Sequence, residues 1–84
     1  MISKAVTVTT SPTLILAADN QPRTCYFHST SGSTYLGDSS VTTSSGLHLP
    51  NNQTITIQVP FGETIYGITN TGTTNVRVLT PDLD

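Results

Sequence analysis

The chain has 84 residues, of which 26 are serine or threonine and only 8 are charged, and its formal net charge is −2. Nucleic-acid-binding proteins need clustered lysine and arginine to neutralise phosphates, and three scattered bases (Lys4, Arg23 and Arg77) exclude that class. No segment approaches the roughly 20 apolar residues of a membrane-spanning helix, and the single cysteine, Cys25, excludes an internal disulfide.

The first third of the chain shows the alternation of apolar and polar side chains that predicts strands. In Ala5–Thr10, Val6 and Val8 point to one side and threonines to the other, which is the pattern of a half-buried strand. Thr13–Ala18 is more continuously apolar, so we expect a strand that is covered on both faces. Arg23–Ser29 alternates again and predicts a third strand.

The remaining strands are short and are separated by turn residues. The stretch Asp38–Gly46 is the most polar in the chain and is relieved only by Val41. Gly67 indicates a bulge or a close backbone approach, and Gly72 indicates a hairpin that needs a positive φ. The strands that the pattern predicts here are Thr34–Gly37, Gln53–Val59, Thr64–Thr69 and Thr74–Thr80, and the short apolar stretch Leu47–Leu49 leads into the turn Pro50–Asn52.

Short strands with turn signals roughly every eight to twelve residues are typical of sandwiches and barrels. We therefore expect an all-β fold, a small antiparallel β-sandwich or jelly-roll-like barrel of about seven to eight short strands. Residues 1–84 form a single domain, with an N-terminal arm at residues 1–4 and a C-terminal tail at residues 81–84. Because a core of this size is marginal, we expect oligomerisation or docking on a larger body to add stability.

The few potential metal ligands do not suggest a metal site. Cys25 and His28 are three residues apart, so a strand places them on opposite faces, and His48 is distant in sequence. Structural zinc needs four converging ligands. We interpret Cys25 as a small core residue and His28 as a solvent-side residue, and we expect no metal or cofactor.

The sequence also lacks the parts of an enzyme active site. There is no Gly-x-Ser-x-Gly elbow, and no helix is predicted that could supply an oxyanion hole. The carboxylates lie in turns or in the tail, where solvated residues are common; they are Asp19, Asp38, Glu63, Asp82 and Asp84. We therefore expect a protein that is not an enzyme, although a convergent Ser/His/Asp cleft would favour a small hydrolase.

Large apolar side chains supply the candidate interface residues, because interfaces are enriched in aromatics and depend on a few buried anchors. Aromatics can also stack on sugars, but packing in a core or an interface is their commoner use. The loop Pro60–Glu63, with Phe61 at its tip, is the foremost docking candidate, and its alternative is that Phe61 folds back into the core. The interface candidates are Ile2, Val6, Val8, Tyr35, Phe61 and Tyr66.

Several stretches, in this order, match a known pattern: Val6–Thr10, Tyr35–Gly37 followed by Val41–Leu47, Gly62–Ile68 and Gly72–Leu79. With these stretches the chain resembles small structural proteins of tailed bacteriophages, especially phages of actinobacteria. Such proteins are described as head decoration, cement or minor capsid proteins. The resemblance implies a capsid decoration protein that binds the outer surface of the major capsid protein lattice and stabilises the head, with no catalytic residues. Pro50–Asn52 departs from the pattern, which has alanine or glycine with an acidic residue there.

The partners expected from this resemblance are the major capsid protein and two further copies of the chain, because shells offer threefold and quasi-threefold positions. The alternative is a tail, baseplate or head-fibre module that contacts host surface carbohydrate, and glycan binding by the isolated domain would favour it. Leu14–Ala18 is too short for a signal peptide, and a free thiol fits a reducing compartment. We expect synthesis in the host cytoplasm and a final location on the capsid exterior of the virion, with no nucleic-acid or membrane partner.

Overall fold

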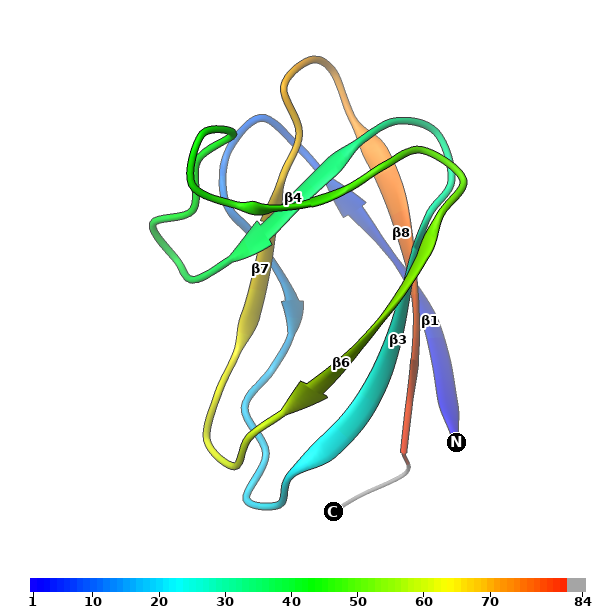
Figure 1. The fold of residues 1–84 in the computed structure, drawn as a ribbon, viewed down its shortest axis with the longest axis vertical. Coiled ribbons are helices and arrows are strands. Elements are labelled where there is room, and N and C mark those ends of the chain that lie inside the picture. Colours follow the sequence, from blue (N-terminus) through cyan, green and yellow to red (C-terminus); the bar gives the residue numbers. More distant parts are fainter. Residues whose placement is uncertain (82–84) are drawn as a thin grey trace.

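The computed structural model describes residues 1–81, which form eight strands and no helix (Figure 1). Among these residues there is accordingly no helix long and apolar enough to span a membrane. Of the tail expected at residues 81–84, only Pro81 lies within the described residues. The strands are β1 (Ile2–Val8), β2 (Thr13–Leu16), β3 (Arg23–Ser29), β4 (Thr34–Gly37), β5 (Leu47–Leu49), β6 (Thr54–Val59), β7 (Ile65–Ile68) and β8 (Thr74–Thr80).

The strands form two four-stranded sheets that pack face to face. Sheet A has the order β1-β8-β3-β6 and sheet B the order β2-β7-β4-β5, and neighbouring strands are antiparallel throughout. The all-β prediction is confirmed, and the architecture is a β-sandwich, not a closed barrel. Because the chain crosses between the sheets several times, strands far apart in sequence become neighbours, as β1 and β8 do.

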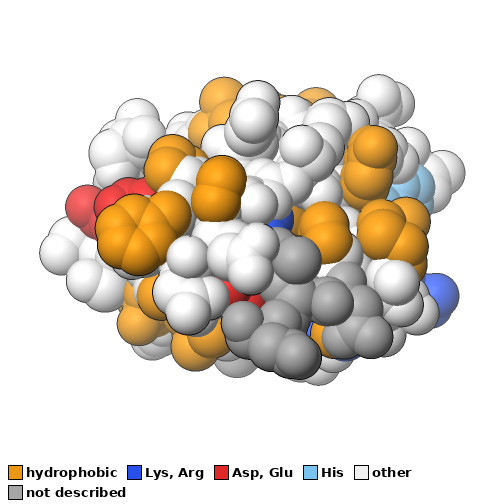
Figure 2. All heavy atoms as spheres, turned by 90° about the horizontal axis from the view of Figure 1, so that it is seen from below, with side chains coloured by type: hydrophobic (Ala, Val, Ile, Leu, Met, Phe, Trp, Pro, Cys, Tyr) orange, Lys and Arg blue, Asp and Glu red, His pale blue; other side chains and the backbone are white. Residues whose placement is uncertain are grey.

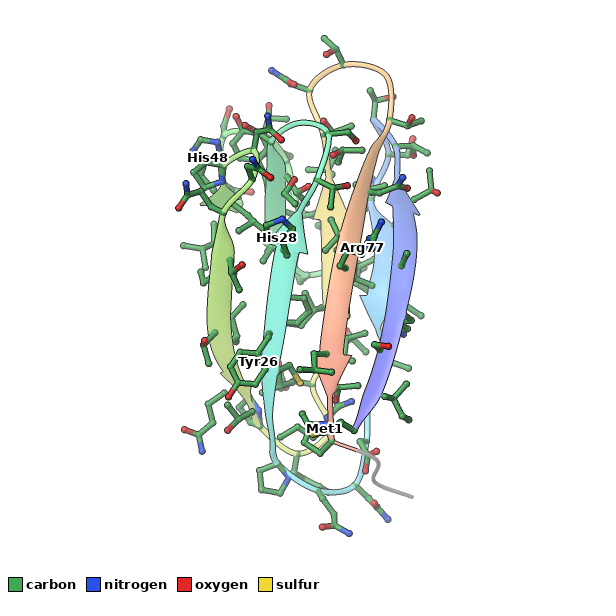
Figure 3. All side chains as sticks on the ribbon, turned by 90° about the vertical axis from the view of Figure 1, so that its right-hand side faces the viewer. Met1, Tyr26, His28, His48 and Arg77 are labelled. Carbon is green, nitrogen blue, oxygen red and sulfur yellow. The ribbon has the colours of Figure 1, made fainter. Side chains whose placement is uncertain are left out.

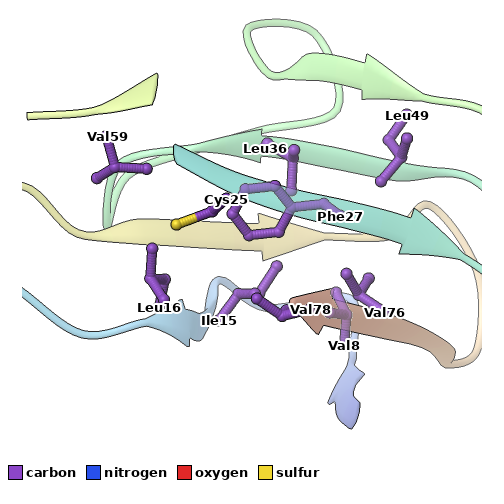
Figure 4. Packing of buried hydrophobic residues seen from close by; sticks show 10 residues of the cluster. All are labelled: Val8, Ile15, Leu16, Cys25, Phe27, Leu36, Leu49, Val59, Val76 and Val78. Carbon is purple, nitrogen blue, oxygen red and sulfur yellow. The ribbon is translucent and has the colours of Figure 1, made fainter. Parts of the chain in front are cut away.

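The core lies between the sheets and follows the alternation seen in the sequence. Every second residue of β3 and β8 points inward, and Phe27, with no exposed surface, occupies the middle of the cluster (Figure 4). Cys25 is also fully buried, as predicted, and its thiol lies 3.4 Å from the Thr80 hydroxyl. The buried cluster comprises Val8, Ile15, Leu16, Cys25, Phe27, Leu36, Leu49, Val59, Val76 and Val78.

Two predictions about the N-terminal strands need correction. Residues 2–4, expected as an arm, continue β1, because Ile2 pairs with Thr80 and the register runs unbroken to Val8. The second strand is not covered on both faces, since Leu14 is 44% exposed. The reason is the two-layer architecture: sheet B is packed on one face only, and Leu14 pairs with Tyr66 on the outer face. The register of β2 to β7 shifts between Leu14 and Leu16.

The polar stretch 38–46 is a folded loop that packs on sheet B. Val41 is buried, yet it lies outside the cluster between the sheets. A Cβ added at Gly37 would lie 2.7 Å from Val41, and one added at Gly46 would lie 2.6 Å from the Cβ of Tyr35. The loop therefore presses so closely on β4 that only glycine fits at these two positions.

Candidate functional site

One end of the sandwich carries the chain start and two connections, and we call it the basal end. It is formed by Met1 and Ile2 with the loops 17–22 and 60–64, which lie at the bottom of Figure 1. The two loops are joined by a 2.8 Å hydrogen bond from the Gly62 amide to the Asp19 carbonyl. Seen from this end, hydrophobic side chains occupy much of the surface and charged groups are few (Figure 2).

Phe61 projects from a tight turn at the basal end. The Glu63 amide donates to the Pro60 carbonyl at 3.3 Å, and Gly62 has a φ of 80°, which is the arrangement of a type II turn. Phe61 occupies the second position of this turn and is 67% exposed. The alternative in which Phe61 folds back into the core is therefore wrong: the turn presents the ring to solvent.

Arg23 links the two basal loops, 17–22 and 60–64, next to this turn. It is buried as the first residue of β3, and its Nη2 donates to the carbonyl oxygens of Ala17 at 2.9 Å and of Glu63 at 3.4 Å. Its Nε is buried and has no hydrogen-bond partner. One side chain thus links the segments that precede β3 and β7, and it holds the carbonyl of Glu63 at the close of the Phe61 turn.

The three N-terminal interface candidates, Ile2, Val6 and Val8, differ in how far they are exposed to solvent. Ile2 is 43% exposed and shares the basal end with Phe61, although Ile2 begins β1 and Phe61 follows β6, the opposite edge strand of sheet A. Val6 is half-buried and packs against the core cluster. Val8 has no exposed surface, because it faces inward between the sheets, so it cannot contact a partner of the folded domain.

Tyr35 and Tyr66 lie on the outer face of sheet B, on β4 and β7. Both are half-buried, and the register pairs Tyr66 with Gly37 of β4, two residues beyond Tyr35. The Tyr35 ring stacks on the His48 ring of β5 with a centroid distance of 4.8 Å and an interplanar angle of 13°. These aromatics serve packing within sheet B and under the loop 38–46, and they are not brought together with Phe61.

The outer face of sheet A is hollowed into a groove of about 390 Å³, which we call the sheet A groove. Figure 3 shows Tyr26 and His28 on β3 and Arg77 on β8 at this face. The residues of the groove are scattered in the sequence, because they come from strands that become neighbours only through the order β1-β8-β3-β6. The side chains that line it include Ser3, Ala5, Tyr26, His28, Arg77 and Leu79.

His28 is positioned in this groove by a neighbouring hydroxyl. Its Nδ1 lies 2.8 Å from Oγ1 of Thr54, the residue opposite it on β6. Cys25 points into the core from the same strand, so the two do not share a site. Within residues 1–81, no three side chains among His, Cys, Asp and Glu come close enough to hold a metal ion.

Comparison with known proteins adds no relationship: no family model, curated protein or solved structure matches the chain. Two surfaces of the described residues are therefore the candidate sites, the basal end with its exposed Phe61 and the sheet A groove.

Proposed function

We propose that the protein decorates a bacteriophage capsid, binding the outer surface of the major capsid protein lattice through its basal end. The observation that carries the proposal is the Phe61 ring, which is 67% exposed on a hydrogen-bonded turn. The resemblance of the sequence to head decoration and cement proteins supports the choice of partner. The role is mechanical: copies bound across neighbouring capsid subunits raise the barrier to rupture of the shell.

A rigid turn makes Phe61 a better anchor than a mobile loop would. Binding costs free energy for every side chain and loop that must become ordered, and a preorganised segment avoids part of this cost. The turn of Phe61 is held by the Pro60–Glu63 hydrogen bond, and the Arg23 side chain holds it through a hydrogen bond to the Glu63 carbonyl. Truncating a buried aromatic anchor typically weakens an interface by about 1–3 kcal/mol.

Homotrimers are the proposed unit on the shell. A domain of 84 residues with a single buried cysteine gains stability from neighbours, and each sheet of the sandwich leaves an edge strand on either side. β1 is the longest of these edges, with seven residues that are mostly exposed. Pairing or covering of such edges is the contact that we expect between sister subunits.

The test compares Phe61→Ala with Leu47→Ala in binding to capsids of the parent phage that lack the protein. Both positions carry exposed apolar side chains, but Leu47 lies on β5, away from the basal end. Phe61→Ala should weaken binding roughly 5- to 150-fold, and Leu47→Ala should leave it unchanged. A cryo-electron microscopy map of decorated particles should show three copies around each threefold position, with the basal end toward the shell.

Particles without the protein give the complementary measurement. They should assemble and package DNA, yet release it at a lower temperature than decorated particles. If the purified protein does not bind bare capsids and its absence leaves particle stability unchanged, the decoration role is wrong.

A further inference from the structure

The sheet A groove has a regular construction that the decoration role does not use. Two rows of side chains cross its floor, each made by register pairs of neighbouring strands. In one row Ser3 of β1 pairs with Leu79 of β8, and Leu79 pairs with Tyr26 of β3. In the next row Ala5 pairs with Arg77, and Arg77 pairs with His28. Side chains opposite one another in such pairs lie about 5 Å apart, so each row is a continuous surface.

The two rows differ in chemistry. The Tyr26 ring and the Leu79 side chain lie next to each other and are both partly exposed, which makes an apolar platform on one side. Arg77 and His28 make a polar side, and Thr54 beyond them fixes the imidazole. The hollow arises because the side chains of β1 at this face, Ser3 and Ala5, are small.

The groove carries positive charge from Arg77 and Lys4, and no carboxylate within residues 1–81 lines it to compensate. Arg77 is exposed, and no ion pair or hydrogen bond joins its side chain to another residue of 1–81. None of the described residues that line the groove is a carboxylate. An arginine guanidinium presents donors in a fixed fork that matches a carboxylate in two parallel hydrogen bonds. The groove is therefore complementary to an anion that also has an apolar face.

We propose that the sheet A groove binds a carboxylate-bearing pyranose, a uronic acid unit of a polysaccharide. The apolar face of the sugar ring lies on Tyr26 and Leu79, and its carboxylate accepts hydrogen bonds from Arg77. His28 and Ser3 stand beside the bound ring and exchange hydrogen bonds with its hydroxyl groups. The groove lies open on a sheet face, so a polysaccharide chain can run across it.

A nucleic acid fits these observations less well, because the groove is lined by only two lysine or arginine side chains, Lys4 and Arg77, where a phosphate backbone needs several. An extended acidic peptide would satisfy Arg77, but it would leave the Tyr26 platform without a matching ring. The proposal concerns a surface other than the basal end, so its test is independent of capsid binding.

The experiment is an NMR titration of the purified protein with tetragalacturonate. Wild-type protein should show saturable shifts at Tyr26, His28 and Arg77, and neutral maltotetraose should produce much weaker ones. Arg77→Gln should weaken tetragalacturonate binding roughly 10- to 100-fold, as expected for the loss of hydrogen bonds to a charged group. Arg77→Lys keeps the charge but loses the forked donors of the guanidinium, so its affinity for tetragalacturonate should lie between those of wild type and Arg77→Gln.

Tyr26→Ala tests the platform, and Tyr35→Ala is its matched control, because Tyr35 is a tyrosine on the outer face of the other sheet. Tyr26→Ala should weaken binding, whereas Tyr35→Ala should not, and circular dichroism should show that both variants are folded. The proposal is overturned if wild-type protein does not bind tetragalacturonate or if Arg77→Gln binds it as well as wild type. Equal, Arg77-dependent binding of tetraglutamate would also overturn it and assign the groove to an acidic peptide.

Discussion

The two phenylalanines of the chain occupy opposite environments, and their truncation should separate core from surface. Phe27 has no exposed surface and lies at the centre of the cluster between the sheets, whereas Phe61 is 67% exposed. Complete burial of a phenylalanine side chain contributes about 1.5–3 kcal/mol. Phe61 is only about one third buried, so Phe61→Ala should lower the free energy of unfolding by about 0.5–1 kcal/mol.

Phe27→Ala removes buried contacts and leaves a cavity, which typically costs about 3–5 kcal/mol. A domain of this length has a total stability of about 4–13 kcal/mol, so this variant should lose a large share of it. It should therefore be compared with wild type at low temperature. Phe27→Leu, which fills most of the space, is the milder variant for the case in which Phe27→Ala does not fold.

Urea unfolding followed by circular dichroism measures both variants under the same conditions. The midpoint should shift little for Phe61→Ala and greatly for Phe27→Ala or Phe27→Leu, with similar slopes. A loss for Phe61→Ala as large as that for Phe27→Ala would show that the Phe61 ring is buried in solution. Such a result would also remove the basis for using Phe61 as an anchor on the capsid.

Two further predictions concern the loops. Gly46→Ala should lower the free energy of unfolding by about 1–3 kcal/mol, because the new Cβ would meet the Cβ of Tyr35 at 2.6 Å and its carbonyl carbon at 3.0 Å; a thermal melt equal to that of wild type would contradict the packing of loop 38–46 on β4. Arg23→Met should cost a similar amount, about 1–3 kcal/mol, because the carbonyls of Ala17 and Glu63 lose a charged donor. Hydrogen exchange should then quicken at the Gly62 amide, and unchanged exchange would show that Arg23 does not hold the turn.

Side-chain alternation predicted most of the strands because each sheet has one buried face. β3, β4 and β8 have the predicted bounds, β6 starts one residue later than expected, and Leu47–Leu49, expected only to lead into a turn, forms β5. The error at β2 has a physical origin: a continuous apolar run does not show how many layers pack against the strand. A sandwich of two sheets covers only one face of β2, and Leu14 lies on the other face, opposite Tyr66.

The candidate site was predictable only where it depends on a local turn. Pro60, Gly62 and the aromatic between them indicate a tight turn with an exposed tip, and the structure has that turn. Val8 was misplaced because alternation shows which face is apolar but not whether that face is buried in the core of the domain or against a partner. The sheet A groove could not be predicted from the sequence, because Arg77 and His28 become neighbours only through the pairing of β8 with β3.

The positions of the two surfaces make the two proposals compatible. The basal end lies at one end of the strands, while the sheet A groove lies along their outer side, over β1, β8 and β3. A copy that docks through Phe61 can therefore keep Arg77 and Tyr26 open to solvent, provided that sister subunits meet at edges and leave this face uncovered. A trimer closed through β1 would bring a neighbour beside Ser3 and Ala5, at the margin of the groove. Sugar binding by assembled particles, compared with that of the isolated domain, would show which sheet edge the sister subunits use.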